Sequence, residues 1–161
     1  MKRAMVVLAV VAGVMGQKGQ AWPTVPEGTD TISVTVSLAE IISVSVTPDS
    51  WAIGPIALGG VSEPKSFTAS VGNVNTKLEI ESTDAAGGWK IGPVTGADQF
   101  AATVTTPPLS LSTAYQQLAA SVAKYSSQGF DLTYHAPTSD TKGGGVDQSF
   151  TVTLKASEAT P

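Results

Sequence analysis

Alternating apolar and polar residues run through most of this chain and predict strands. In the stretch TISVTVSL, Ile32, Val34, Val36 and Leu38 share one face, and hydroxyl-bearing residues occupy the other. Successive side chains of a strand point to opposite sides of a sheet, so this pattern is typical of a strand with one buried face. Further apolar sets follow, separated by turn residues: Ile42, Val44 and Val46; Trp51, Ile53 and Ile56; Phe67, Ala69 and Val71; Leu78 and Ile80; Trp89 and Ile91; Phe100, Ala102 and Val104; Phe130, Leu132, Tyr134 and Ala136; Phe150, Val152, Leu154 and Ala156.

The spacing of these sets predicts an all-β fold. Eight or nine short strands, with turn signals every 8 to 15 residues, are typical of an antiparallel, Ig-like or jelly-roll-like β-sandwich. Residues 51–56, which contain Gly54 and Pro55, are expected to form a short, irregular edge strand. We expect the large aromatic side chains to fill the core of a single domain over residues 30–161; they are Trp51, Phe67, Trp89, Phe100, Phe130, Tyr134 and Phe150.

One segment departs from the alternation. Between Ser112 and Tyr125, apolar residues recur at intervals of three and four, and Thr113 with Gln116 matches a capping box. This spacing predicts one short helix that covers an end or an open edge of the sandwich.

The N-terminus has the features of a secretory signal peptide. Lys2 and Arg3 precede an apolar run that ends at Gly16, and Ala21 closes a short polar stretch. The run is shorter than the roughly twenty residues that span a bilayer. We therefore expect residues 1–21 to be a signal peptide and residues 22–29 a flexible leader, with no transmembrane segment in the mature chain. An uncleaved anchor is the alternative.

Charge and cysteine content narrow the classes of partner. The sequence has 13 acidic side chains, nine basic ones and no cysteine. Loss of residues 1–21 would remove Lys2, Arg3 and Lys18, which leaves six basic side chains and a net charge of about −7. Because Arg3 is the only arginine, the mature chain would have no guanidinium with which to bind phosphate. Nucleic acid is therefore not an expected partner.

Few residues suit catalysis or a cofactor. His135 is the only histidine, and Asp131, Thr133 and His135 share the polar face of one predicted strand. No G-x-S-x-G element accompanies them, and one histidine without cysteine makes zinc improbable, so we expect neither enzymatic activity nor a cofactor. Asp140 and Asp147 lie in one glycine-containing loop and are weak Ca²⁺ candidates, because EF-hand spacing is missing.

Aromatic residues leave an adhesion or carbohydrate-binding module as the alternative function. Exported sandwiches present aromatic platforms to glycans, and the candidates here are Trp22, Trp51, Trp89, Tyr115, Tyr125 and Tyr134. Trp51, Trp89 and Tyr134 share the register of apolar neighbours, which places them more naturally in the core.

The N-terminal alternating segment is the strongest functional candidate. Residues 30–38 carry no charge between Asp30 and Glu40, and a phase break at Ala39-Glu40 separates them from the next strand. An isolated strand leaves backbone groups unpaired and an apolar face wet, so it needs a sheet. That sheet is either its own or the open edge of a neighbour, as in donor-strand complementation.

The layout of this region carries a resemblance. The alternating strand, a second strand ISVSVTP and the element W-x-I-G-x-I-x-L-G-G resemble the start of secreted bacterial Ig-like subunits of the pilin and spore-coat-U kind. The likeness covers residues 30–60, and the Cys pair typical of many of those subunits is missing. It implies a secreted structural subunit of a surface filament or coat, with copies of itself as partner and residues 30–38 as donor strand.

Overall fold

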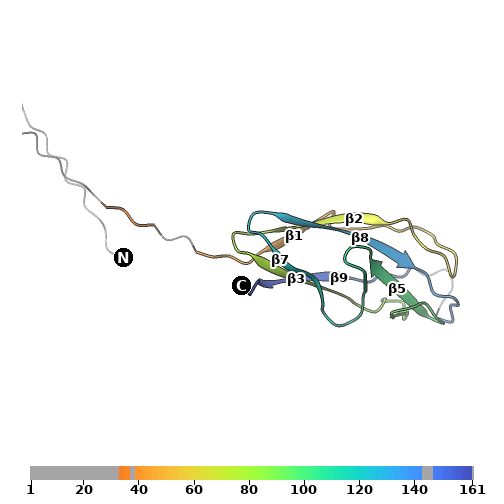
Figure 1. Cartoon of the computed structure of the whole chain (residues 1–161). Helices are drawn as coiled ribbons and strands as arrows, with labels where there is room; N and C mark the ends of the chain where they lie inside the picture. The colour runs from red at the N-terminus through yellow and green to blue at the C-terminus, as the bar shows by residue number, and fades with distance from the viewer. Residues whose placement is uncertain (1–32, 37–38, 143–146, 161) are drawn as a thin grey trace, which may run out of the picture. The chain divides into compact units, whose positions relative to one another are not determined.

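The computed structural model describes residues 33–36, 39–142 and 147–160, and it is a β-sandwich of two sheets (Figure 1). The chain divides into two units, Met1–Ser37 and Leu38–Pro161, and the sandwich belongs to the second. The expected signal peptide and leader, Trp22, Ile32, Leu38 and the triple glycine at 143–145 lie outside the described residues. No helix suited to crossing a bilayer occurs within the described residues.

The first sheet has the strand order β1-β2-β8-β5-β4, and β6 pairs with β5. The second sheet has the order β7-β3-β9. All the ladders are antiparallel except the short β4–β5 pair. The nine strands within the described residues confirm the all-β sandwich; their bounds are β1 Val44–Thr47, β2 Lys65–Val71, β3 Thr76–Ser82, β4 Lys90–Ile91, β5 Gln99–Val104, β6 Leu109–Ser110, β7 Gln116–Val122, β8 Ser127–His135 and β9 Val152–Glu158.

The core lies between the two sheets and is built by the alternation. Along β3, Leu78 and Ile80 are buried while Lys77, Glu79 and Glu81 are not. Among the aromatic residues, Phe67, Phe100, Phe130 and Tyr134 are buried, whereas Trp51, Trp89 and Phe150 are half-buried against the core. The Phe67 and Phe130 rings of β2 and β8 lie 5.7 Å apart between centroids, and Phe100 of β5 lies 4.8 Å from Phe150, which precedes β9.

The expected helix over residues 112–125 is wrong, because this segment contains β7. Leu118 and Val122 are both buried. Residues four apart lie on one face of a helix and also on one face of a strand, so their spacing alone does not decide between the two. Pairing with β3, which includes register shifts around Leu78, decides for the strand. Gln116, expected in a capping box, instead donates through Nε2 to the carbonyl of Ser110 at 2.9 Å.

Two smaller expectations near the first strand are also wrong. Residues 51–56 form no strand; they are irregular, and Ile53 and Ile56 pack against the cluster around Phe100 and Tyr134. Ile42, expected on a buried face, is 46% exposed. It precedes β1 and lies outside the β1–β2 ladder, so its alternation with Val44 and Val46 does not bury it.

The strand register shows which loops and turns lie together at each end of the sandwich. Val44 pairs with Val71, and Thr76 pairs with Glu158, so β1 begins where β2 and β9 end (Figure 1). We call this the proximal end; it comprises residues 39–43, 72–75, 123–126 and 159–160. The opposite, distal end comprises residues 57–62, 92–98 and 136–142, which adjoin the Ala101–His135 pair.

Candidate assembly seam

Strands β1 and β9 each end a sheet, and they meet along one flank of the sandwich. In the described part of the chain, β1 pairs only with β2, and β9 pairs only with β3. The two strands contact one another across the gap between the sheets. We call this flank the β1–β9 seam; its inward-facing residues are Val44, Val46, Val152, Leu154 and Ala156.

The inward face of the seam is less buried than the strands behind it. Leu154 pairs with Ile80, and Ala156 pairs with Leu78. Both of these β3 partners are 0% exposed, whereas the two β9 residues are only half-buried. Val46 in β1 has the same relation to Ala69, which is also 0% exposed. Along this flank, apolar side chains that point into the sandwich are therefore partly exposed to solvent.

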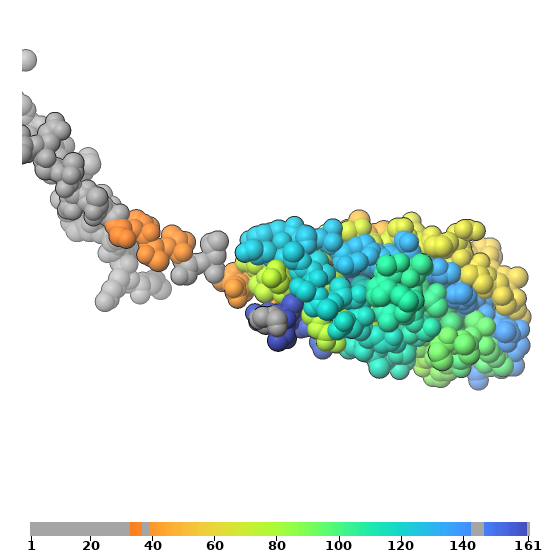
Figure 2. Space-filling model, in the orientation of Figure 1, coloured from red at the N-terminus to blue at the C-terminus, as the bar shows by residue number. Residues whose placement is uncertain are grey.

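The opposite flank is closed, so this exposure does not follow from edge position alone. Strand β7 is the other edge of the three-stranded sheet, and it too flanks β3. Its inward residues Leu118 and Val122 are 3% and 5% exposed. Leu111, which follows β6, is fully buried, and Figure 2 shows the green to cyan residues of β5–β7 as a continuous surface. The large inward side chains of this flank are thus buried, with Ala119 half-buried between them, whereas the large inward side chains of the seam are all half-buried.

The seam has the chemistry to accept an extended segment. Edge strands present unpaired backbone N–H and C=O groups that template another strand. The half-buried valine, leucine and alanine side chains offer apolar contacts at alternate positions, which is the spacing at which a strand presents one face. A segment with apolar residues at every second position would satisfy both requirements.

Part of the N-terminal alternating segment is described and is exposed. Val34 and Val36 have exposed fractions of 78% and 75%, and no ladder of the described residues includes positions 33–36. The other two apolar members, Ile32 and Leu38, lie outside the described residues.

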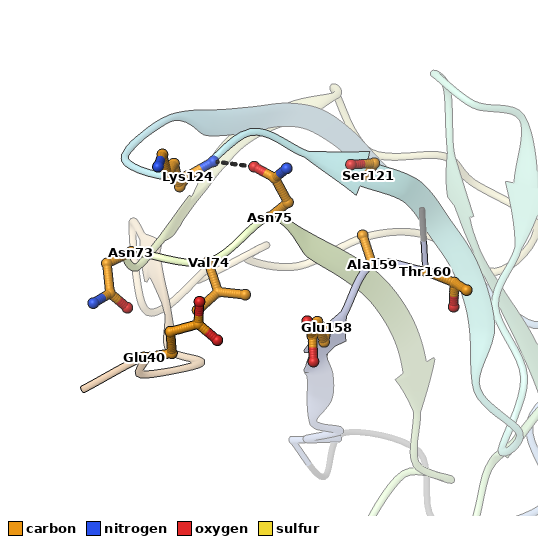
Figure 3. Close-up of a pocket in the computed structure, with 9 residues that line it drawn as sticks. All are labelled: Glu40, Asn73, Val74, Asn75, Ser121, Lys124, Glu158, Ala159 and Thr160. Atoms are coloured by element: carbon orange, nitrogen blue, oxygen red, sulfur yellow. Dashed lines mark hydrogen bonds between the residues drawn. The ribbon is translucent and has the colours of Figure 1, made fainter. Parts of the chain in front are cut away.

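The chain leaves the sandwich from an anchored point at the proximal end. Asn73 accepts a hydrogen bond from the Ile41 N–H at 2.7 Å and donates through Nδ2 to the carbonyl of Ala39 at 3.0 Å. A polar cavity of about 310 Å³ adjoins this anchor (Figure 3). Glu40 and Glu158 line it together with Lys124, whose backbone N–H donates to Asn75 Oδ1 at 3.0 Å. Its polar lining offers no apolar seat for the alternating segment.

The outer face of the β3–β9 pair is charged and solvated. The Lys77 ammonium, 2.8 Å from Glu79 Oε1, lowers the pKa of that carboxyl by hydrogen bonding, and Lys155 at 3.6 Å assists. Lys155 also lies over the Tyr115 ring, 5.1 Å from its centroid. The hydrogen bond to Glu81 raises the pKa of Tyr115. This face therefore presents ions to water, unlike the seam.

The polar row expected on β8 is present, but its members have separate partners. Asp131 and His135 alternate with buried Phe130, Leu132 and Tyr134, as expected for an outward face. Asp131 Oδ1 accepts from Ser66 Oγ at 2.6 Å, whereas His135 Nε2 lies 3.2 Å from Thr103 Oγ1. The structure therefore does not join the two residues into one catalytic pair.

The two calcium candidates, Asp140 and Asp147, have different surroundings. Asp140 Oδ1 accepts from Trp89 Nε1 at 3.0 Å and from the Lys142 N–H at 2.8 Å. Asp147 is exposed, and four residues outside the description separate it from Lys142. Across the described ranges, no group of three or more histidine or acidic side chains is arranged to hold a metal ion.

Trp22 lies outside the described residues, and the glycan candidates within them form no shared aromatic platform. Tyr134 is buried, and Trp51 and Trp89 are half-buried against the core. Tyr115 and Tyr125 are exposed, but they flank opposite ends of the seven-residue strand β7. Since a strand rises about 3.3 Å per residue, these two rings are not neighbours.

Sequence reasoning missed the incomplete burial along the β1–β9 seam. The alternation of Val152, Leu154 and Ala156 is that of any half-buried strand, so nothing local marks β9 as incompletely covered. The backbone of Tyr125 was missed too: its φ is 58°, and its side chain is 74% exposed. Tyr125 lies in the turn before β8, and an aromatic residue there gave no signal of this conformation.

Comparison with known proteins gives a limited result. No family model matches the chain, and no curated protein matches it significantly. Among solved structures, a chain from a structure of a chaperone-usher pilus is similar, with 15% sequence identity and a TM-score of 0.39. The alignment covers 83% of this chain and 99% of that one. These values are too low to assign a family or a function.

Proposed function

We propose that this protein is an exported structural subunit that self-assembles when residues 30–38 of one copy insert into the β1–β9 seam of the next. The observation that carries the proposal is the contrast between the two flanks. Leu118 and Val122 of β7 are sealed, whereas Leu154 and Ala156 of β9 are half-buried although they face the same core. A strand laid along the seam would complete the seal.

The chemistry of the segment complements that of the seam. The segment presents four apolar side chains at alternate positions and no charge between Asp30 and Glu40. Burying a valine, leucine or isoleucine side chain contributes about 1.5–3 kcal/mol before the ordering cost. The inserted strand would also cover Val46 and Leu154 and pair the open edge of β9. Apolar side chains of both copies would become buried, which supports strand exchange.

The lengths of the two edge strands favour one direction of insertion. β9 has seven residues and β1 has four. Antiparallel ladders are slightly more stable per residue than parallel ones, so the longer partner favours a segment antiparallel to β9. Since β9 runs from the distal to the proximal end, the inserted segment then runs from proximal to distal and emerges at the distal end.

Insertion in this direction generates an open-ended assembly. Each copy receives a segment along its seam and sends its own segment from its proximal end into another copy. A head-to-tail contact of this kind does not close on itself and generates a filament. The opposite direction would bring two proximal ends together and allow a closed, strand-swapped dimer. The signal-peptide features of residues 1–21 support assembly outside the cytoplasm.

Paired charge substitutions in the full chain test the proposal. The double variant Val34→Asp, Val36→Asp places two carboxylates on the apolar face of the segment. We expect it to be exported and folded but to form no filaments in negative-stain micrographs, because the seam cannot bury those charges. The matched control, Ser33→Asp, Thr35→Asp, adds the same charge to the other face and is expected to assemble.

The outcomes separate the models. Loss of filaments in both double variants would indicate a general charge effect and contradict the proposal. Filaments of undiminished length from the Val34→Asp, Val36→Asp protein would also overturn it. A parent protein that forms only dimers would overturn the filament and support the opposite insertion direction.

A further inference from the structure

The exposed apolar side chains of the sandwich gather at its two ends. At the proximal end, Ile41, Ile42 and Tyr125 are 61%, 46% and 74% exposed. At the distal end, Leu58, Val61 and Val94 are 54%, 56% and 67% exposed. The remaining large apolar side chain exposed in the described sandwich is Tyr115, whose ring lies beneath Lys155.

At each end, contacts connect the segments that carry the exposed apolar side chains. At the proximal end, the Gly72 N–H donates to Ser43 O at 3.1 Å, and its carbonyl accepts from the Tyr125 N–H at 2.8 Å. Gly72 thus ties the turn that carries Tyr125 to the residues beside Ile41 and Ile42. At the distal end, Val61 bridges to His135, and Val94 lines the same shallow cavity as His135. The Gly59 N–H, next to Leu58, donates to Pro137 O at 2.8 Å.

The side chain of Tyr125 contributes little to the fold, although its backbone N–H binds Gly72. Its φ of 58° lies in the left-handed region, which favours glycine or asparagine and strains an aromatic residue. Its side chain is 74% exposed, so the sandwich gains little packing from the ring. A strained and exposed aromatic side chain is suited to contact with another molecule.

The length of the N-terminal segment determines which surface lies against the proximal end. In the proposed assembly, residues 30–38 run along β9 of the acceptor and emerge at its distal end. Nine residues of extended strand span about 30 Å, which is longer than the seven-residue β9, so the segment covers the whole length of that strand. The three residues from Leu38 to Ile41 reach at most about 11 Å further. The proximal end of the donor copy must therefore lie against the distal end of the acceptor.

We infer that the proximal cluster Ile41, Ile42 and Tyr125 of one copy docks on the distal cluster Leu58, Val61 and Val94 of the next. This inference rests on the proposed strand exchange and adds a second interface to it. The partner is another copy of this chain, and the end-to-end contact would hold successive sandwiches in a fixed orientation.

Introduced cysteines test the contact, because the chain has none of its own. Tyr125→Cys is combined in one chain with Leu58→Cys, Val61→Cys or Val94→Cys. Filaments grown under reducing conditions are then treated with a short thiol-specific crosslinker. We expect at least one combination to give a ladder of covalent multimers on a denaturing gel. The matched control replaces Tyr125→Cys with Tyr115→Cys, another exposed tyrosine away from the proximal end, and should give no ladder.

The failures can be told apart. If the reduced protein forms no filaments, strand exchange and the end-to-end contact are both overturned. If filaments form and none of the three combinations gives a ladder, only the end-to-end contact is overturned. A ladder from the Tyr115→Cys control as well would mean lateral association of filaments and would also overturn it.

Tyr125→Gly gives a second, independent measurement. Glycine accepts the left-handed backbone, so we expect the monomer to unfold at the same or a higher temperature. Its filaments should dissociate at lower denaturant concentration, because the anchor ring is lost. A merely structural role for Tyr125 predicts a less stable monomer and would contradict the inference, as would filaments of unchanged resistance.

Discussion

The side chain of Asn73 holds the backbone of Ile41 across 32 positions of sequence. Its Oδ1 accepts from the Ile41 N–H at 2.7 Å, and its Nδ2 donates to the carbonyl of Ala39 at 3.0 Å. The two bonds fix the point from which the N-terminal segment leaves the sandwich. A fixed exit matters because the N-terminal segment, residues 30–38, ends just before Ala39.

Substitution of Asn73 should loosen this exit. Asn73→Ala removes two exposed hydrogen bonds, and we expect the free energy of unfolding to fall by about 1 kcal/mol. Amide exchange at Ile41 should accelerate, as measured by NMR. Asn73→Asp keeps the acceptor for the Ile41 N–H and loses only the donor, so protection at Ile41 should be largely retained. Equal loss of protection in both variants would contradict the assigned bond.

Gly72 should not tolerate a side chain. A Cβ there would lie 2.5 Å from Ser43 Oγ and 2.8 Å from the carbonyl oxygen of Ile41, so the backbone has to shift. We expect Gly72→Ala to destabilise the fold by about 1–3 kcal/mol in denaturant unfolding.

Gly129 is the matched control for that substitution. Its nearest contact for an added Cβ is Phe67 O at 3.9 Å, an ordinary van der Waals distance. Gly129→Ala in β8 should be neutral or slightly stabilising, because glycine weakens a strand interior. Similar losses in the two variants would show that the close approach at Gly72 does not matter.

A variant with a defective seam should bind a variant with a defective N-terminal segment. Leu154→Asp places a carboxylate on the acceptor face and leaves residues 30–38 intact. Mixed with the Val34→Asp, Val36→Asp protein, which keeps an intact seam, it should form one-to-one heterodimers and no longer species in size-exclusion chromatography with light scattering.

The control for this experiment lies on the outer face of the same strand. Ser157→Asp lies opposite Lys77 in the β3–β9 ladder, and we expect it to fold and to polymerise like the parent. Circular dichroism checks that Leu154→Asp folds. Heterodimers that form without residues 30–38 of the Leu154→Asp chain would contradict strand exchange.

Stability should fall at alkaline pH because of Tyr134. Burial raises the pKa of its hydroxyl from 10.0 to about 12. The folded chain therefore keeps this proton while the unfolded chain loses it, and stability present below pH 10 is lost as the pH rises towards 12. The loss is at most about 2–3 kcal/mol, since one pKa unit corresponds to about 1.4 kcal/mol.

Tyr134→Phe tests that assignment. Thermal unfolding of this variant should depend less on pH between 10 and 12 than that of the parent. A smaller dependence should remain, because the pKa of Tyr115 is also raised. An unchanged alkaline profile in Tyr134→Phe would rule out Tyr134 as its source.

Several features could be predicted from local pattern. The alternation in β2, β3, β8 and β9 identified these strands and their inward faces, because side-chain direction in a strand depends only on position parity. The same parity placed Val34 and Val36 on one face of the N-terminal segment. The segment over 112–125 was misassigned because its apolar spacing suits both a helix and a strand, and only pairing with β3 decides between them.

By itself, the sequence determined an all-β sandwich and the alternation of the N-terminal segment. The tertiary structure alone decided that Leu118 is buried while Leu154 is half-buried. It also placed Tyr125 and Val94 at opposite ends of the sandwich. The physical reason is that alternation assigns the direction of a side chain, whereas burial depends on which distant segment packs against it. The open seam is a property of that packing and has no local signature.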